Sequence, residues 1–146
     1  MTETRPEREP TSETPQSNER PPGVTDEVVL AVGRLTEALE TVERARGHLY
    51  EFHQLCGSAD AKLADAIEQL RDAGQSDTAQ ELQRDLLGRN VAPDRWSFQV
   101  VEEYDDGYWS PFREHERRVR EFLLDGRRHV AEAEMKERER SRPSEA

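Results

Sequence analysis

The fold is decided by residues 25–56, TDEVVLAVGRLTEALETVERARGHLYEFHQLC, in which apolar side chains repeat with a helical period. One row recurs every seven residues and a second row follows it four residues later; they comprise Val28, Leu35, Val42, Leu49 and Cys56, and then Val32 and Leu39, continued by Arg46 and His53. Rows with this spacing form one stripe along an α-helix. Thr25 is suited to cap the start of this helix and Gly57 to end it. The pattern therefore predicts a long amphipathic helix from Thr25 to Cys56.

Helical periodicity continues through the rest of the chain. We expect Ser58 to cap a second helix that extends to Gly74, and a third helix to end before Gly88. Gly74 favours a break between the second and third helices, with one kinked helix as the alternative. Ser110 and Pro111 are typical of the N-cap and first turn of a last helix. The sequence thus predicts an all-α fold, a small antiparallel bundle of three to four helices.

The two ends of the chain depart from this pattern. Residues 1–23 contain five of the eight prolines and one large apolar residue, Met1, so we expect a disordered N-terminal tail. We expect residues 24–140 to form the bundle as one domain and residues 141–146 to be a disordered C-terminal end. The chain contains neither the apolar run of a signal peptide nor about 20 consecutive apolar residues for a membrane span. With Cys56 as the single cysteine, we expect a cytoplasmic protein without a membrane partner.

The charge of the chain is negative and unevenly distributed. There are 32 acidic and 21 basic residues, which give a formal net charge of −11. Nucleic acids and anionic membranes are bound through basic patches, so this balance disfavours both as partners. Residues 91–109 contain five acids and one arginine, whereas residues 110–146 contain nine acids and ten bases. The interleaved charges of this second segment are typical of a solvated, salt-bridged helix face.

Motifs with a strong mechanical meaning, such as GxxxxGK, GxSxG, HExxH and paired CxxC, are absent from the sequence. We therefore expect no catalytic residue and no cofactor. The alternative is a metal-binding helical bundle, which could be enzymatic, with a transition metal ion held by His and carboxylate ligands. The candidate ligands are His53, Cys56, Glu102, Glu103, Asp105, His115 and His129. Of these, His53 and Cys56 are three residues apart and would lie on one helix face.

Residues 96–109, WSFQVVEEYDDGYW, combine aromatic and acidic side chains. They contain both tryptophans, two of the three tyrosines, four carboxylates and no basic residue. The pattern is compatible with a strand, a helix or a loop, and Asp106–Gly107 is typical of a turn. Aromatic residues between bundle helices most often close the end of the bundle, and we expect Trp109 to do so. An apolar surface rimmed by carboxylates is also typical of a docking site.

The function that this sequence favours is a non-catalytic helical protein-interaction or regulatory module that docks a partner through residues 96–109. The expected partner-binding residues are Trp96, Phe98, Glu102, Glu103, Tyr104, Asp105, Asp106, Tyr108 and Trp109. Because four of them are acidic, we expect a protein partner with a basic surface. An acidic protein that competes for nucleic-acid-binding surfaces is a third possibility, and the oligomeric state stays open.

Overall fold

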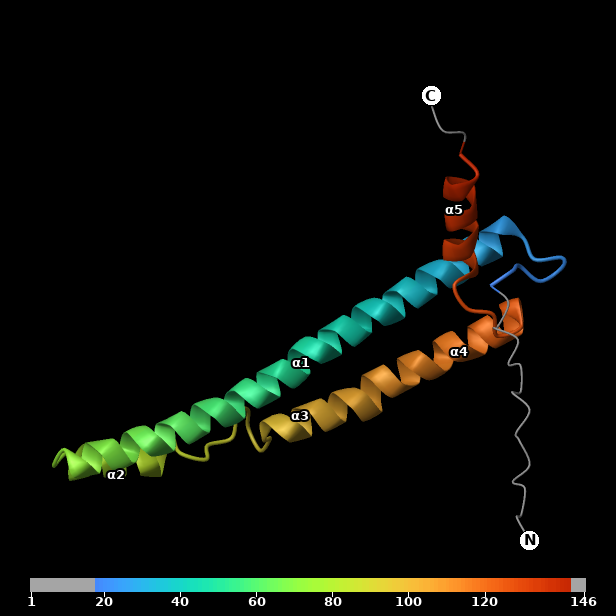
Figure 1. Cartoon of the computed structure of the whole chain (residues 1–146). Helices are drawn as coiled ribbons and strands as arrows, with labels where there is room; N and C mark the ends of the chain where they lie inside the picture. Colours follow the sequence, from blue (N-terminus) through green and yellow to red (C-terminus); the bar gives the residue numbers. More distant parts are fainter. Residues whose placement is uncertain (1–17, 143–146) are drawn as a thin grey trace, which may run out of the picture. The chain divides into compact units, whose positions relative to one another are not determined.

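The computed structural model describes residues 18–142, which contain helices and no β-strand. The elements are α1 (Asp26–Asp72), α2 (Ser76–Asp85), α3 (Ser97–Tyr104), the π-helical segment η1 (Asp105–Trp109), α4 (Ser110–Leu124) and α5 (Val130–Arg140) (Figure 1). The expected all-α class, a small bundle of antiparallel helices, is confirmed for the described residues. Most of the predicted tail, residues 1–17, and the end of the chain, residues 143–146, lie outside them.

The chain divides into two compact units. Of the described residues, the first unit comprises 18–36 and 116–142, and the second unit comprises Glu37–His115. Both α1 and α4 contribute residues to each unit. The expectation that residues 24–140 form one domain stays a prediction.

α1 is one uninterrupted helix, so the predicted helix end at Gly57 and the predicted cap at Ser58 are wrong. Glycine within a helix costs only about 1 kcal/mol relative to alanine. Ile67, further along the same stripe, is 2% exposed, and its burial favours continuing the helix past Gly57. α1 ends near Gly74, whose φ of +79° is accessible to a residue without Cβ. The predicted break at Gly74 is therefore confirmed.

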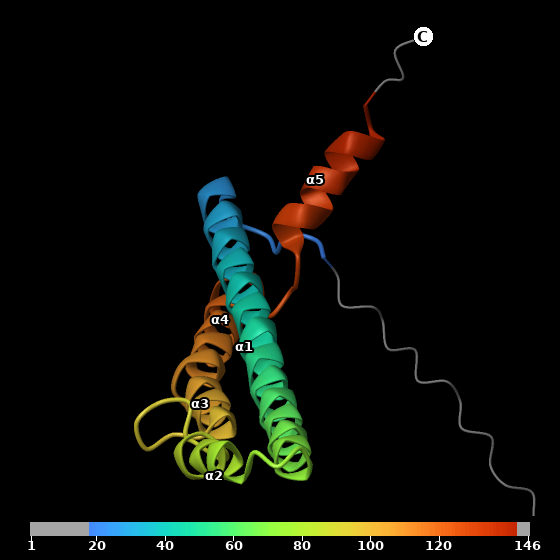
Figure 2. The same ribbon diagram turned by 90° about the vertical axis from the view of Figure 1, so that its left-hand side faces the viewer.

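In the second unit, α2 turns back along the C-terminal part of α1 (Figures 1 and 2). Ala79 of α2 is completely buried. The turn that follows α2 is fastened to α1, because the backbone N–H of Gly88 donates a hydrogen bond of 2.9 Å to Oδ1 of Asp60. The α1–α2 pair is thus a short helical hairpin with a small core.

Also in the second unit, α3 and η1 run antiparallel to α1 (Figure 1). Three interactions fix this direction, since two contacts near the start of this part of α1 are made by residues 104 and 105 and the contact further along α1 is made by residue 97. They are Val42 with Tyr104, Arg46 with Asp105, and His53 with Ser97. Val42 and Val101 are 8% and 7% exposed and provide apolar burial along this contact.

Residues 97–124 form one continuous helical stretch, in which η1 replaces one regular α-helical turn. α4 begins at Ser110 as predicted, but Ser110 has helical dihedral angles and continues η1, so its predicted role as an N-cap is wrong, as is the predicted turn at Asp106–Gly107. In a regular α-helix the ring of Pro111 would clash with the carbonyl group of Gly107 four residues earlier. The wider π-helical turn lies directly before Pro111 and relieves this clash.

The first unit is built around Val29, Val32, Leu124 and Val130, each at most 3% exposed. They come from the start of α1, the end of α4 and the start of α5. Gly33 allows the close approach of α5, because a Cβ atom built there would lie 3.0 Å from Cβ of Ala131. Small residues at this crossing therefore let the two backbones pack tightly.

Glu116 of α4 is a buried acid in the first unit, with 5% of its surface exposed. Its Oε1 atom accepts hydrogen bonds of 3.1 Å from both Thr36 Oγ1 and Arg120 Nε. Arg120 also donates a hydrogen bond of 2.7 Å to the carbonyl oxygen of Gly126. Gly126, with φ +75°, lies in the turn after α4, so this network links the buried acid to the helix end.

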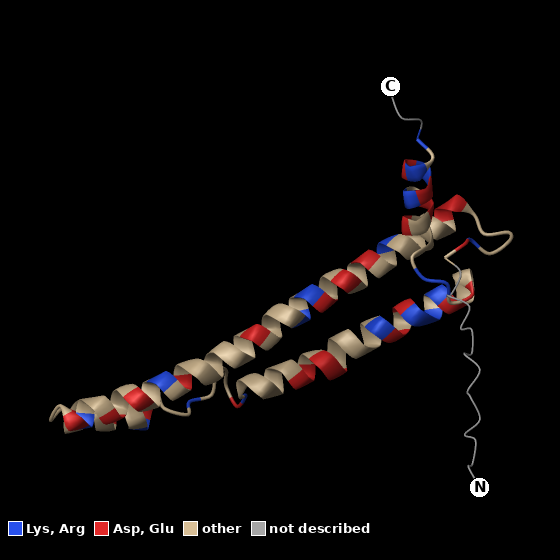
Figure 3. Cartoon of the chain, viewed as in Figure 1, with Lys and Arg blue, Asp and Glu red and all other residues tan. Residues whose placement is uncertain are grey.

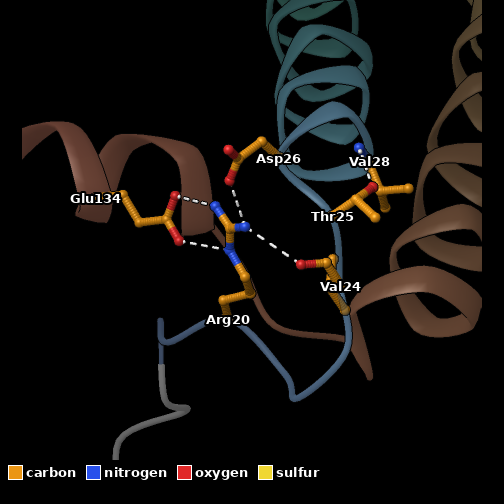
Figure 4. A network of polar contacts seen from close by, with 6 residues as sticks. All are labelled: Arg20, Val24, Thr25, Asp26, Val28 and Glu134. Atoms are coloured by element: carbon orange, nitrogen blue, oxygen red, sulfur yellow. Dashed lines mark hydrogen bonds and ion pairs between the residues drawn. The ribbon is translucent and has the colours of Figure 1, made fainter.

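Arg20 lies within the predicted tail, residues 1–23, yet it is fixed by four hydrogen bonds (Figure 4). Its Nε and NH2 atoms donate to the two carboxylate oxygens of Glu134 at 2.9 and 2.8 Å. NH1 donates to Asp26 Oδ1 at 2.6 Å and to the carbonyl oxygen of Val24 at 3.2 Å. Hydrogen bonding to Arg20 lowers the pKa of Glu134. Arg20 is therefore ordered although the sequence places it in the predicted tail. Ion pairs hold it in place, whereas the prediction considered only apolar burial.

Candidate functional site

Trp96 and Phe98, at the start of α3, are two exposed aromatic residues that contact each other. Their side chains are 58% and 39% exposed. The ring centroids lie 5.5 Å apart at an interplanar angle of 89°, an edge-to-face arrangement. The backbone N–H of Trp96 donates a hydrogen bond of 2.9 Å to Oε1 of Gln99. This hydrogen bond stabilises the first turn of α3, which carries both rings.

A second row of aromatic residues continues along the helical stretch. Tyr104, Tyr108 and Phe112 have successive ring-centroid distances of 5.4 and 5.8 Å. Tyr104 is half-buried and its hydroxyl group donates to the carbonyl oxygen of Val42 at 3.5 Å, whereas Tyr108 is 51% exposed. In this row the central residue, Tyr108, is exposed, and the residues on either side of it, Tyr104 and Phe112, are half-buried.

Trp109, the last residue of η1, is half-buried beside two arginines. The guanidinium carbons of Arg46 and Arg113 lie 4.3 and 4.7 Å from the centroid of the indole ring, within the range of cation–π interactions. The indole Nε1 atom is buried and has no hydrogen-bond partner among the described residues. Trp109 thus differs from Trp96, whose ring faces mostly solvent.

Arg46 of α1 connects this tryptophan to the acidic residues of the segment. Its Nε and NH2 atoms donate hydrogen bonds of 2.7 and 3.0 Å to the two oxygens of Asp105. The hydrogen bonds to Asp105 raise the pKa of Arg46. A bidentate pair of this kind holds the guanidinium plane in one orientation, and here that orientation places it over Trp109.

The four carboxylates of the segment have different environments. Asp105 is half-buried in its ion pair with Arg46, and Glu103 pairs with Arg95 at 2.7 Å on the surface. Glu102 and Asp106 are exposed, and neither has an ion-pair partner among the described residues. Figure 3 shows the acidic residues of α3 and η1 followed along the helical stretch by the basic residues of α4.

The exposed side chains of residues 96–109 define what we call the acidic-aromatic surface. It consists of Trp96, Phe98, Glu102, Glu103, Asp106 and Tyr108. The other predicted partner-binding residues, Tyr104, Asp105 and Trp109, are half-buried against α1 or α4. The segment is therefore divided into an inner set that contacts α1 or α4 and an outer set that faces solvent.

The candidate metal ligands of the second unit are placed at several separate positions. No three of His53, Cys56, Glu102, Glu103, Asp105 and His115 have ligand atoms within 4.8 Å of one another. Nδ1 of His53 lies 2.7 Å from Oγ of Ser97, and Cys56 is a half-buried free thiol. In the first unit, His129 is exposed and lies 3.7 Å from a carboxylate oxygen of Glu132.

The contacts of Arg46 and Arg113 with Trp109 are not predicted from the sequence. On the helical stripe Arg46 is expected to be a snorkelling or ion-paired residue, and the structure adds its partners, Asp105 and Trp109. Arg113 was assigned to a solvated helix face. A signal for Arg46 does exist, since a positive charge on an otherwise apolar stripe needs a carboxylate or an aromatic ring opposite it. Arg113 carries no comparable signal, because its position four residues after Trp109 is informative only once the helix is known to be continuous.

No protein-family model matches this sequence, and neither the curated proteins nor the solved structures show a significant similarity to it. Among the helices of residues 18–142, none combines the length and the apolar character that crossing a bilayer would require.

Proposed function

We propose that this protein is a non-catalytic, helical protein-interaction module whose acidic-aromatic surface docks a protein partner with a basic surface. The observation that carries this proposal is the exposure of Trp96 and Phe98 on the rigid start of α3. Leaving a tryptophan 58% exposed forgoes burial that the domain could otherwise use for stability.

The geometry of the two rings supports a docking role. Tryptophan is enriched among the residues that dominate the energetics of protein interfaces. Trp96 and Phe98 are held edge to face and carried on a capped helix start, so little side-chain entropy is lost when a partner binds. An apolar pair of this kind would form the centre of the contact.

The charges around the rings indicate the chemistry of the partner. Glu102 and Asp106 are exposed carboxylates, and they would attract a basic surface and accelerate its association. A basic partner also has cations that can stack on an open indole face. The chain itself provides this contact at Trp109, where two guanidinium groups lie over the ring.

The half-buried residues have a structural role in this proposal. Asp105 is paired with Arg46, and Trp109 lies against Arg46 and Arg113, so neither group is available to a partner without breaking internal contacts. The docking residues are therefore a subset of the nine that the sequence suggested, and the subset can be tested without disturbing the hairpin.

The test is affinity capture from extracts of the source cells, with wild-type protein, Trp96→Ala and Glu102→Lys/Asp106→Lys as baits. The matched control is Glu43→Lys/Glu51→Lys, which reverses two exposed acids of α1 in the same unit. We expect at least one protein whose capture is lost with both surface variants and retained with the control. Direct titration of that purified protein should then show at least about a tenfold weaker affinity for each surface variant. Equal capture by all four baits would reject the proposal.

A further inference from the structure

We propose that one face of α1 in the second unit pairs with the same face of a second copy of this chain, in antiparallel orientation. The residues of this face, which we call the α1 outer face, are Ala45, His48, Phe52, Leu55, Ala59, Lys62, Ala66 and Gln69. All eight are exposed. None of them belongs to the acidic-aromatic surface, so this inference goes beyond the proposed function.

The spacing of these residues makes one continuous surface along the helix. Intervals that alternate between three and four residues keep the side chains on one side of α1 and are typical of the seam of a two-helix coiled coil. The face is about 36 Å long at 1.5 Å per residue. The internal contacts of α1 in this unit use other residues, namely Val42, Arg46, His53 and Asp60. Figure 2 shows α2 and α3 together on one side of α1, which leaves another side for a partner.

Two large apolar residues of the α1 outer face are open to solvent, because Phe52 is 44% exposed and Leu55 is 61% exposed. They belong to a larger set of exposed apolar side chains in the second unit: Tyr50, Phe52, Leu55, Leu86, Val91, Trp96, Phe98 and Tyr108. The buried hydrophobic residues of the unit are fewer: Leu39, Val42, Ile67, Ala79 and Val101. Such an excess of exposed apolar side chains is typical of chains whose folded state includes a partner subunit.

The α1 outer face is complementary in shape to itself. When two copies lie antiparallel with residue 55 opposite residue 59, Leu55 of each copy packs against Ala59 of the other. The same register places Phe52 against Lys62, whose methylene chain and ammonium group both pack well on an aromatic ring. Large side chains thus meet small or flexible ones, and this allows the two helices to approach closely.

The charges of α1 select the antiparallel orientation. In this register Lys62 lies next to Glu51 of the other copy, and His48 lies next to Asp65. Parallel helices in register would instead place each of these groups against its own equivalent. None of the four has an ion-pair or hydrogen-bond partner among residues 18–142. Because twofold symmetry makes each contact twice, the arrangement closes as a dimer.

Sedimentation equilibrium of the full chain at about 150 mM salt tests the charged contact. The wild type should form a dimer with a dissociation constant in the micromolar range. Glu51→Lys and Lys62→Glu should each raise this constant by at least about tenfold, because like charges then face each other twice. The double variant Glu51→Lys/Lys62→Glu should return to within about threefold of the wild type, since opposite charges meet again.

Recovery in the double variant reports a contact between copies. Glu51 and Lys62 are separated by about 16 Å along α1, too far to pair within one chain. The recovery also requires a folded protein, so it separates loss of contact from loss of fold.

A matched pair of leucine variants tests the apolar contact. Leu55→Gln should raise the dissociation constant at least about tenfold, because it replaces the apolar centre of the interface by a polar group. Leu30→Gln changes a leucine of the same helix that is 67% exposed but lies outside the α1 outer face, and it should dimerise like the wild type. Circular dichroism of both variants should show the helical content of the wild type.

Three results would overturn this inference: a monomer at all concentrations up to about 200 µM, single charge variants with wild-type affinity, or a double variant that dimerises no better than the single variants. A monomer that captures a different protein through Leu55 would assign the α1 outer face to that partner.

The proposed function can be separated from this inference. Trp96→Ala should dimerise like the wild type, and loss of its dimer would oppose a contact confined to α1. The control bait Glu43→Lys/Glu51→Lys should be largely monomeric and still capture the basic partner. If dimers form as described and no basic protein is captured, the proposed function fails while the second-copy contact stands.

Discussion

Replacing Trp109 by alanine should destabilise the fold far more than replacing Trp96. Trp109 is more buried than exposed, whereas Trp96 is 58% exposed. A tryptophan buries up to about 250 Å2, so losing roughly two-thirds of that burial costs about 4 kcal/mol at ~25 cal/mol per Å2. We therefore expect Trp109→Ala to lower the free energy of unfolding by about 3–5 kcal/mol, the range for a large aromatic residue in a core. Trp96→Ala should lower the free energy of unfolding by about 1–2 kcal/mol. Less buried apolar area is lost than at Trp109, and part of that area is also buried in the unfolded chain.

Urea unfolding followed by circular dichroism measures both costs directly. For a domain of this size the Trp109→Ala melting temperature should fall by roughly 10–20 °C. Single-tryptophan proteins give an independent check: in Trp96→Phe the remaining Trp109 should be protected from acrylamide quenching, and in Trp109→Phe the remaining Trp96 should be readily quenched. The reasoning is refuted if Trp96→Ala costs as much as Trp109→Ala, or if Trp109 is the more readily quenched of the two.

Three further predictions concern α1 and the Arg20 contacts. Gly57→Ala should raise the free energy of unfolding by about 0.5–1 kcal/mol, because Gly57 is inside α1 with nothing within 4 Å of its Cβ position; unchanged or lower stability in urea would contradict an uninterrupted helix. Gly33→Leu should lower it by about 1–3 kcal/mol or more, because even Cβ would lie 3.0 Å from Ala131 Cβ; a neutral result in the same assay would exclude the tight crossing of α1 and α5. Arg20→Ala should lower the melting temperature near pH 7. Because the pKa of Glu134 is depressed by Arg20, this contribution is present above the unfolded value of about 4.3 and is lost as pH falls through the lower folded value. The difference in melting temperature between wild type and Arg20→Ala should therefore shrink below about pH 4, and a difference that grows there would oppose the ion-pair explanation.

The helical class could be predicted because apolar periodicity is a local property of the sequence. The stripe through Val28, Val32 and Leu39 identified α1, and Thr25 caps it as expected, with Oγ1 accepting a hydrogen bond from the N–H of Val28 at 3.3 Å. Gly74 also ended a helix as expected, because a positive φ there costs glycine little.

The wrong helix end and the wrong N-cap have a common cause. Gly57 carries a local signal for a helix end and Ser110 one for an N-cap, each worth about 1 kcal/mol. Burial of a residue such as Ile67 is worth about 1.5–3 kcal/mol, and it depends on tertiary neighbours that a local signal does not include. Where the two compete, packing decides, and the helix continues.

The candidate site was predicted as a segment, and the roles within it required the structure. Composition alone identified residues 96–109 as unusual. The exposure of Trp96, in contrast to the burial of the Trp109 indole nitrogen, depends on which helix face meets α1. Arg46 and Asp105 are 59 residues apart, and their pairing follows from the antiparallel packing of α3 and η1 against α1.

The π-helical segment determines which residues face inward and which face solvent. Before it, the residues that lie against α1 or are buried follow helical spacing at Ser97, Val101 and Tyr104; after it, the inward residues are Trp109, Phe112, Glu116, Val119 and Leu123. All intervals within the two sets are three or four residues, but Tyr104 and Trp109 are five apart. In a regular α-helix an interval of five residues adds about 100° of rotation relative to an interval of four. Tyr108 would then face inward in place of Trp109. The wider turn of η1 absorbs the extra residue and keeps both sets on the inner face. Tyr108 stays 51% exposed on the acidic-aromatic surface as a consequence, and Trp109 is placed beside Arg46 and Arg113.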